Sequence, residues 1–302
     1  MPDVILKHVP GMKRAAAVPV HRAEDLSESV FLNGHVANSA PCVIRGAVKH
    51  WAAVQNWRDK NHLKSRSGHH EVMLFNSEYY ASWPKLEASK RDVSFADAID
   101  YLHAEDTKVA MVVTSRTSEL QMDLGGLSFM TRAEPAFSYD AARYFFYRDA
   151  GTTWHFHSFD ETLMSQIVGS KRIGLLKTNT PSYRAMRMHF VTEKYYDDPA
   201  ALDAFDDSGL EWFVADLDAG DALYIPPLWW HGVIPTTRTF GATTAVTWRS
   251  PLNVIADSLR QMAAGDIDMI GQASMIKFQP LMEVARKLGL EKELEIAWNH
   301  KL

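Results

Sequence analysis

The amino-acid sequence predicts a mainly β domain, either a sandwich or a barrel, with helices before and after it. The first observation is a series of short apolar, β-branched and aromatic segments that alternate with turn residues between residues 108 and 250. That spacing is typical of sandwiches and barrels. The second is the mixture of helical and strand patterns in the first hundred residues. The third is the loss of strand signals after Leu252, where helical periodicity takes over.

The first hundred residues contain two predicted helices and a strand. In "AEDLSESVFLNGHV", Leu26 and Val30 recur at helical spacing. "PCVIRGAV" is a short apolar strand that Gly46 ends. "SFADAIDYLHAED" begins with Ser94 and has Asp97 three residues later, close to a capping box at a helix start.

Seven segments of the central region read as strands. Gly169 and the pair Gly220–Asp221 mark turns between them, which we expect to be hairpin-like joints. The seven segments are "KVAMVVTS", "RYFFYRDAG", "TLMSQIVG", "KRIGLLKT", "EWFVADLDAG", "DALYIPP" and "GATTAVTWRS".

The C-terminal region predicts helices in "LNVIADSLRQMAAG", "ASMIKFQPLMEVARKLG" and "EKELEIAW", with Gly265 and Gly289 as stop signals. An apolar stripe could pack on the barrel or on a second chain; it comprises Met275, Phe278, Leu281 and Met282. We therefore predict a barrel domain with its N-terminal decoration over residues 1–250, and a helical appendix over residues 251–302 that could form a homodimer.

Composition and charge exclude several classes of function. The chain has 302 residues, 46% of them hydrophobic, and a formal charge of -5. That mild acidity argues against a nucleic-acid partner. The N-terminus lacks the long apolar stretch of a signal peptide, and no segment approaches the roughly 18 to 20 apolar residues that span a bilayer. The one cysteine, Cys42, cannot form an intrachain disulfide and reads as a buried core residue. We expect a soluble cytoplasmic protein.

The stretch "GTTWHFHSFDET" contains two histidines that could share a metal ion. If "TTWHFHS" is a strand, His155 and His157 point to the same face and Phe156 to the other. A His-x-His pair is a weak signal by itself. A second segment strengthens it: in "DLDAGDALYIPPLWWHGV", an apolar strand and two prolines lead to His231. Antiparallel packing of the two segments would bring His231 to the same metal as a third ligand.

Two polar residues near these histidines could bind an anion. Lys171 in "VGSKR" follows the strand after the His-x-His segment, at its end. A lysine there is commonly solvated, but it could instead point into the barrel and offer an ammonium to an anionic cosubstrate. Thr152 could donate its hydroxyl to the same carboxylate.

Taken together, these segments resemble the JmjC/cupin-like family of Fe(II)- and 2-oxoglutarate-dependent oxygenases. "PCVIRGAVKHWAAVQNW" is similar to the family's opening strand, "TTWHFHSFDETLMSQIVGSKR" to its first metal strand, and "AGDALYIPPLWWHGV" to its second metal segment. "TTAVTW" is similar to the next barrel strand. The resemblance implies a double-stranded β-helix, or jelly roll, with Fe(II), 2-oxoglutarate and O2 as cofactor and cosubstrates, and a C-terminal dimerisation element.

The resemblance also implies roles for individual residues. His155 and His231 match the two metal histidines, and Lys171 matches the basic residue that binds the distal carboxylate of 2-oxoglutarate, with Thr152 as its partner. Thr243 stands where several members place another polar cosubstrate contact. Tyr147 and Tyr144, on the strand before Thr152, could line the pocket.

One departure from the family is the residue at the third ligand position. The usual motif is His-x-Asp or His-x-Glu, whereas this chain has His157 there. Asp160 is an odd number of residues away, so an unbroken strand would turn it to the opposite face, although a β-bulge could restore it. Glu161 falls on the correct face but further along. We favour His157 as the third ligand.

This departure leaves three functions open. The first is an active 2-oxoglutarate-dependent hydroxylase. The second is a three-histidine dioxygenase that uses O2 without 2-oxoglutarate. The third is a non-catalytic metal-binding protein, since three histidines also suit zinc. The family acts on protein side chains, RNA and small metabolites; we expect a small molecule or a peptide or protein side chain here. Residues 186–199, with His189, read as a loop that could shape the substrate entrance.

Overall fold

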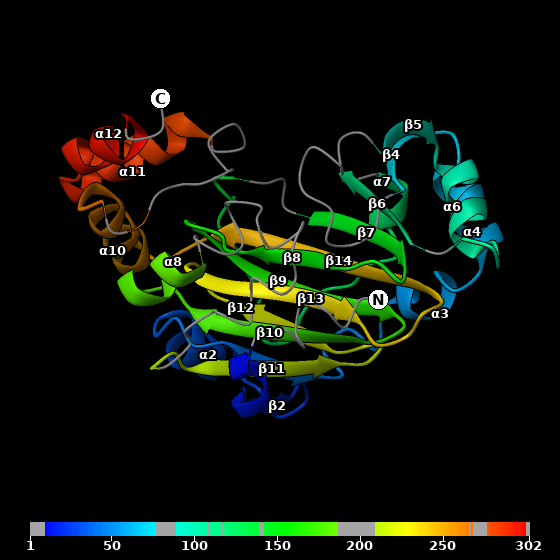
Figure 1. The fold of residues 1–302 in the computed structure, drawn as a ribbon, viewed down its shortest axis with the longest axis horizontal. Coiled ribbons are helices and arrows are strands. Elements are labelled where there is room, and N and C mark those ends of the chain that lie inside the picture. Colours follow the sequence, from blue (N-terminus) through cyan, green and yellow to red (C-terminus); the bar gives the residue numbers. More distant parts are fainter. Residues whose placement is uncertain are drawn as a thin grey trace.

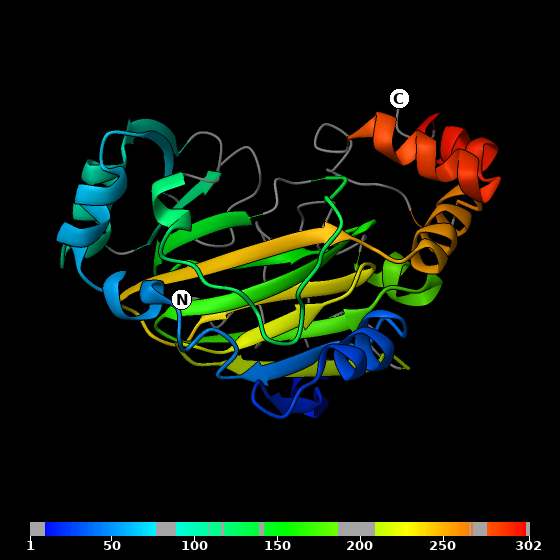
Figure 2. The same cartoon turned by 180° about the vertical axis from the view of Figure 1, so that it is seen from behind.

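The structure is a computed structural model in which two β-sheets form the centre of the molecule (Figure 1). It describes residues 10–76, 89–107, 109–115, 118–138, 142–186, 209–265, 267 and 277–299. Helices lie at two opposite ends of the sheets, as the view from behind also shows (Figure 2). The mainly β class predicted from the sequence, with helices before and after, is confirmed.

The smaller sheet has five strands. Its order is β1 (Ala16–Ala17), β11 (Trp212–Leu217), β10 (Lys171–Lys177), β13 (Trp229–Pro235) and β8 (Thr152–His155). β10 pairs antiparallel with both β11 and β13, and β13 pairs antiparallel with β8. Only β1, at the edge, pairs parallel to its neighbour.

The larger sheet has nine strands and faces the first. Its order is β2 (Val20–Arg22), β3 (Cys42–Arg45), β12 (Ala222–Ile225), β9 (Asp160–Val168), β14 (Phe240–Arg249), β7 (Ala142–Arg148), β6 (Ala110–Ser115), β4 (Glu71–Phe75) and β5 (Lys90–Ser94). The long strands β9, β14 and β7 occupy its middle, and β9 is buried at nearly every position.

The turns at Gly169 and Gly220 are not hairpins, contrary to expectation. Both glycines have the positive φ that favours glycine, +80° and +99° respectively. However, β9 and β10 belong to different sheets, and so do β11 and β12. Each turn therefore carries the chain from one sheet to the other. Such crossings make a jelly roll of two facing sheets rather than a sandwich of sequential hairpins.

Asp221 connects the turn at Gly220 to the end of β3 through hydrogen bonds. The Asp221 carboxylate accepts a hydrogen bond from the backbone N–H of Gly46 at 2.9 Å and from Arg45 Nη1 at 2.5 Å. Asp221 is largely buried, so this charge-assisted pair is shielded on one side from solvent. These hydrogen bonds between the "VIRG" segment and the Gly220–Asp221 turn therefore hold β3 against β12.

The helices flank the sheets as the periodicity predicts. Ser94 caps α6, accepting from the Asp97 N–H at 3.1 Å and donating to its carboxylate at 2.6 Å. Gly289 ends α11 in the left-handed conformation. The helices are η1 (Pro10–Arg14), α2 (Glu28–Phe31), the π-helical η2 (Leu32–Val36), α3 (Ala52–Asn56), α4 (Lys60–Ser67), α6 (Phe95–His103), α7 (Ser118–Gln121), α8 (Thr180–Met186), α10 (Leu252–Ala263), α11 (Phe278–Leu288) and α12 (Glu291–Asn299).

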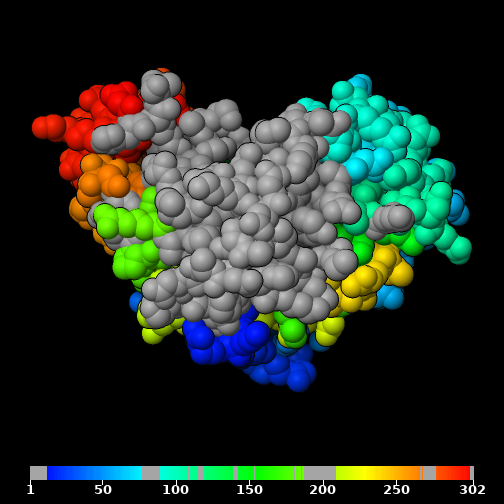
Figure 3. Space-filling model, viewed as in Figure 1, coloured from blue at the N-terminus to red at the C-terminus, as the bar shows by residue number. Residues whose placement is uncertain are grey.

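The C-terminal helices pack onto the sheets of their own chain. Leu281 is fully buried, and Phe278 and Met282 are partly buried against the same hydrophobic cluster as Trp154 and Trp230. Met275 lies outside the described residues. Figure 3 shows these helices in orange and red, at the opposite end of the molecule from the segment coloured cyan. The boundary at residue 250 and the homodimer remain predictions.

Among the described residues, no helix combines the length and apolar character that a membrane span requires.

Gly241 sits where two central strands approach closely. It lies opposite Tyr147 in the β14–β7 ladder, and a Cβ at this position would overlap the Tyr147 ring. We expect Gly241→Ala to lower the free energy of unfolding by about 1–3 kcal/mol, because the buried ring has to move. The matched control Gly126→Ala, which has open space around the new methyl, should change it by less than about 0.5 kcal/mol. Urea denaturation measures both; equal stability of the two variants would contradict this packing.

Candidate functional site

Three histidine rings meet in the space between the two sheets. His231 on β13 lies directly opposite His155, the last residue of β8, and their ring centroids are 4.1 Å apart. The His157 ring is 5.1 Å from that of His231 and 5.4 Å from that of His155. One ring nitrogen from each histidine lies within 4.8 Å of the others. The expected antiparallel packing of the two histidine segments is confirmed.

The strand that carries these histidines is shorter and less regular than expected. β8 ends at His155, so His157 lies just beyond it. The Phe156 ring does turn away from the cluster, packing at 4.7 Å against Trp230. The β13–β8 register shifts: three residues of β13, from His231 to Val233, oppose four of β8, from Thr152 to His155.

This β-bulge places Thr152 and His155 beside the same cavity. Because they are three residues apart, a regular strand would turn them to opposite faces. The extra residue in β8 changes that parity. A bulge near Asp160 was one alternative in the sequence, whereas this bulge lies between Thr152 and His155.

A strained turn holds the segment of His157 next to β13. Leu228 has a φ of +56°, unusual for a residue with a side chain. Its N–H donates to the His157 carbonyl at 2.7 Å, and its carbonyl accepts from the Thr178 N–H at 2.8 Å. The "PPLWW" turn therefore connects three segments around the histidine cluster, and the backbone strain is compensated by these two bonds.

Hydrogen bonds orient two of the three rings. His231 Nδ1 lies 2.9 Å from the Trp229 carbonyl oxygen, which can only accept, so Nδ1 carries the proton and Nε2 keeps its lone pair. His157 Nδ1 lies 2.7 Å from the Thr162 hydroxyl. Second partners of this kind fix the tautomer and direction of metal-binding histidines. Thr162 was not singled out from the sequence.

Burial keeps His157 and His231 uncharged. It is the main cause that lowers the pKa of both residues well below the ordinary value, and the neighbouring imidazoles lower both further. These two rings are therefore neutral at physiological pH, the form in which imidazole binds metals.

Lys171 points into this cavity and is buried, with 5% of its surface exposed. It begins β10 rather than ending the preceding strand, because Gly169 and Ser170 form the turn between the sheets. Its Nζ lies 4.2 Å from the centre of the Tyr147 ring. Among the described residues no carboxylate pairs with it. Burial lowers the pKa of Lys171 to about 7.

Tyr147 and Thr243 meet at a buried glutamine. Gln166 on β9 donates from Nε2 to the Tyr147 hydroxyl at 2.8 Å and accepts from the Thr243 hydroxyl at 2.9 Å. This network holds the aromatic ring against Lys171. Burial raises the pKa of Tyr147, so its hydroxyl stays neutral. Gln166 was missed in the sequence, where a glutamine within an apolar strand was its only signal.

Further residues line the cavity from both sheets. Arg143 places a second cationic side chain there. It has the same strand parity as Tyr147, a signal that could have identified it. The remaining lining residues are Met111, Phe145, Ala150, Gly151, Thr162, Met164, Ala245 and Thr247.

The carboxylates that were alternatives for the third ligand have other partners. Asp160 accepts hydrogen bonds from the backbone N–H groups of Phe137 at 2.7 Å and Ser138 at 2.5 Å. Glu161 accepts from the Tyr224 hydroxyl at 2.6 Å, and burial raises its pKa to about 8. Neither residue joins the three-histidine cluster.

Two other sequence predictions have different outcomes. Tyr144 does not line the cavity but packs edge-on against Trp57 at 5.6 Å, in the core on the other face of the sheet. The prediction for it was wrong because Tyr144 and Tyr147 differ by an odd number of residues on one strand. Residues 187–199, including His189, lie outside the described residues.

A jelly roll with three imidazoles and a buried lysine between its sheets is a cupin-type domain. A family model described as the cupin-like domain matches residues 27–255, well over half of the chain. The protein therefore belongs to the cupin-like domain family, and the resemblance inferred from the sequence is confirmed.

Two curated relatives carry the Jumonji name or abbreviation. Lysine-specific demethylase JMJ30 of Arabidopsis thaliana is 26% identical over 243 residues, which cover 74% of this chain and 54% of that protein. Jumonji C domain-containing protein 5 of Drosophila melanogaster is 24% identical over 221 residues, 67% of this chain and 53% of that protein. The chain thus spans about half the length of these relatives.

The burial of Lys171 predicts a pH dependence of stability. The unfolded chain holds the lysine proton up to the ordinary pKa of 10.5, whereas the folded state holds it only to about 7. Between these values the unfolded state binds more protons, so Lys171 destabilises the fold increasingly as pH falls from 10.5 to 7, and the effect is constant below 7.

We therefore expect Lys171→Met to raise the free energy of unfolding at pH 7 by roughly 2–5 kcal/mol, with the gain shrinking as pH approaches 10. Urea denaturation of chelator-treated protein across this pH range measures it. Lys177→Met, at an exposed position at the other end of β10, is the matched control and should stay within about 0.5 kcal/mol. A gain independent of pH would contradict the assigned cause.

Proposed function

We propose that this protein is an Fe(II)- and 2-oxoglutarate-dependent oxygenase that uses O2 to hydroxylate its substrate. The observation that carries the proposal is a buried ammonium, Lys171, in the same cavity as three convergent imidazoles. A metal site alone does not require a buried cation, which costs stability. A dianionic cosubstrate beside the metal accounts for it.

The donor set fits a first-row transition metal. His155, His157 and His231 would hold Fe(II), each through one ring nitrogen. Lys171 and Thr152 line the same cavity as these histidines. When bound, iron and 2-oxoglutarate supply the redox chemistry, in which 2-oxoglutarate loses CO2 to give succinate and one oxygen atom enters the substrate.

The protein's own residues position the cosubstrate. The Lys171 ammonium attracts the distal carboxylate, and the Thr152 hydroxyl donates a hydrogen bond to it. The Tyr147 ring holds the ammonium in place, and Thr243 anchors that ring through Gln166. The surrounding apolar side chains exclude water, which strengthens each of these interactions.

His157 in place of a carboxylate makes the site more positive by one unit. That charge favours binding of the 2-oxoglutarate dianion. The same observation favours a second candidate function, a three-histidine dioxygenase that binds its organic substrate directly and takes up O2 without 2-oxoglutarate. Lys171 would then bind a carboxylate of the substrate, or it would bind no ligand at all.

The substrate class that we propose is a peptide or protein side chain. Its support is the name of one relative, a lysine-specific demethylase, at 26% identity. Small molecules are the alternative.

We expect purified protein with Fe(II) to convert 2-oxoglutarate to succinate. Lys171→Ala should weaken the apparent affinity for 2-oxoglutarate about 10- to 100-fold, the value of a charged hydrogen bond. The matched control, Lys177→Ala on the same strand, should leave it unchanged. The assay measures succinate formation and O2 uptake in parallel. Uptake of O2 without formation of succinate would support the second candidate function. Absence of both succinate formation and O2 uptake with every tested peptide would contradict both candidate functions.

We expect His157→Ala to weaken Fe(II) binding by more than the roughly 10- to 100-fold that losing an outer-shell partner costs. His157→Asp should keep iron and turn over 2-oxoglutarate, because a carboxylate is an equally suitable ligand. His50→Ala, at an exposed histidine outside the cavity, is the control. Metal titration and succinate formation test the set. Unchanged iron affinity in His157→Ala would remove His157 from the ligands.

A further inference from the structure

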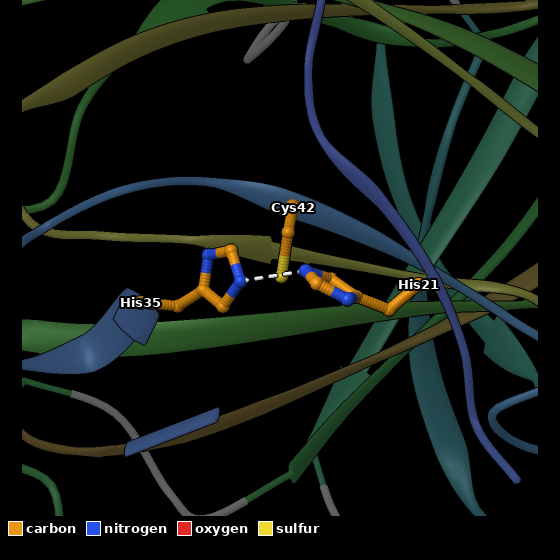
Figure 4. Close-up of side chains that lie close together, drawn as sticks. All are labelled: His21, His35 and Cys42. Carbon is orange, nitrogen blue, oxygen red and sulfur yellow. Dashed lines mark hydrogen bonds between the residues drawn. The ribbon is translucent and has the colours of Figure 1, made fainter. Parts of the chain in front are cut away.

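A second cluster of metal-binding side chains lies at the far edge of the nine-stranded sheet. His21 belongs to β2, Cys42 begins the neighbouring parallel strand β3, and His35 lies in the π-helical turn η2. One ligand atom from each of the three lies within 4.8 Å of the others. Figure 4 shows the two rings and the thiol converging from three separate segments.

The His35 ring is oriented as metal-binding histidines usually are. His35 Nδ1 lies 3.0 Å from the Ala40 carbonyl oxygen, which can only accept, so that nitrogen carries the proton. His35 Nε2 therefore presents a lone pair, and it lies 2.8 Å from His21 Nε2. A backbone carbonyl behind a histidine is a common way to orient a metal ligand.

The π-helical turn is a second, independent observation. The N–H of Ala37 donates to the Leu32 carbonyl at 2.8 Å, five residues back, and the N–H of Ala40 donates to the His35 carbonyl at 3.0 Å. π-Helical turns are rare and concentrate at functional sites. Here the turn carries His35, so a rare local geometry presents the ligand.

Burial and donor type indicate which ion would fit. Cys42 is fully buried and His35 nearly so, whereas His21 is half-buried. The site is therefore closed on the inside and open to solvent beside His21. One sulfur and two imidazole nitrogens, with a position left for water, match the tetrahedral preference of zinc. Hard cations such as Mg²⁺ and Ca²⁺ prefer oxygen ligands.

We propose that His21, His35 and Cys42 form a zinc-binding site, separate from the three-histidine cavity. Zinc would replace the hydrogen bond between the two Nε2 atoms with a coordinate bond from each. His21 then carries its ring proton on Nδ1, and the Cys42 thiol releases its proton to solvent. Burial raises the pKa of that thiol to about 12, so removal of this proton lowers the zinc affinity and makes it depend on pH.

The site would fasten the N-terminal segment to the jelly roll. β2 pairs with β3, and Cys42 itself lies opposite Tyr224 of β12. β12 leads through two prolines to the strand that carries His231, which belongs to the other sheet. Zinc at the edge would therefore stabilise the nine-stranded sheet, which faces the sheet that carries His155 and His231.

Cobalt(II) tests the site without relying on enzyme activity. Cys42 is the only cysteine, and the three-histidine cavity has no sulfur ligand. A thiolate-to-cobalt charge-transfer band in the near ultraviolet therefore reports Cys42 alone. We expect wild-type protein and His155→Ala to show this band on titration with Co²⁺. Cys42→Ser should lose it, and wild-type protein that binds cobalt without the band would overturn the proposal.

Thermal unfolding provides the second measurement. It also shows whether a variant has lost stability in the absence of metal. In the His155→Ala background, Zn²⁺ should raise Tm, as any ligand specific to the folded state does. Adding His21→Gln, a change at a half-buried position, should abolish the shift while leaving the Tm of chelator-treated protein nearly the same. His50→Gln is the matched control and should keep the shift. A shift that survives His21→Gln would overturn the assignment.

Discussion

The antiparallel pairing of β13 with β8 is the constraint on which the site depends. It places His231 opposite His155 and, through the bulge in β8, brings Thr152 to the same cavity. Both sheets contribute to this cavity, because the crossings at Gly169 and Gly220 alternate the chain between them. The register of one strand pair therefore sets which side chains share the interior, before any ligand is considered.

The interior combines groups that are costly to bury. Lys171 has an aromatic ring beneath it instead of a carboxylate, and the imidazoles of His157 and His231 remain neutral. Each would be more stable in solvent, so the core around them must supply the difference. Trp154, Trp230 and the C-terminal helices form a large cluster next to the site. Stability elsewhere in the fold thus permits this unfavourable burial of polar groups in the cavity.

Much of the fold and part of the site could be predicted from the sequence. Strand patterns, the Ser94 cap and the antiparallel meeting of the histidine segments follow from local periodicity and turn chemistry. The predictions that were wrong depend on long-range register. Gly169 and Gly220 turn the chain between the two sheets instead of forming hairpins, and strand parity places Tyr144 outside the cavity. Gln166 was missed because its hydrogen bond with Thr243 forms only when distant strands pair. Thr162 was missed because its hydrogen bond with His157 spans the irregular segment between β8 and β9. Cys42 looked like ordinary core because its partners, His21 and His35, come from other segments.

The left-handed turn at Leu228 has a consequence for how the protein can evolve. Its two backbone bonds join the segment of His157 to the end of β10, and β13 begins at the next residue. Side chains alternate along a strand, so one inserted or deleted residue between Pro226 and Trp229 would rotate His231 out of the interior. Loops at the rim of a jelly roll can vary in length, but this one is fixed. Changes in length at other loops should therefore disturb the histidine cluster less than a change in the length of this turn.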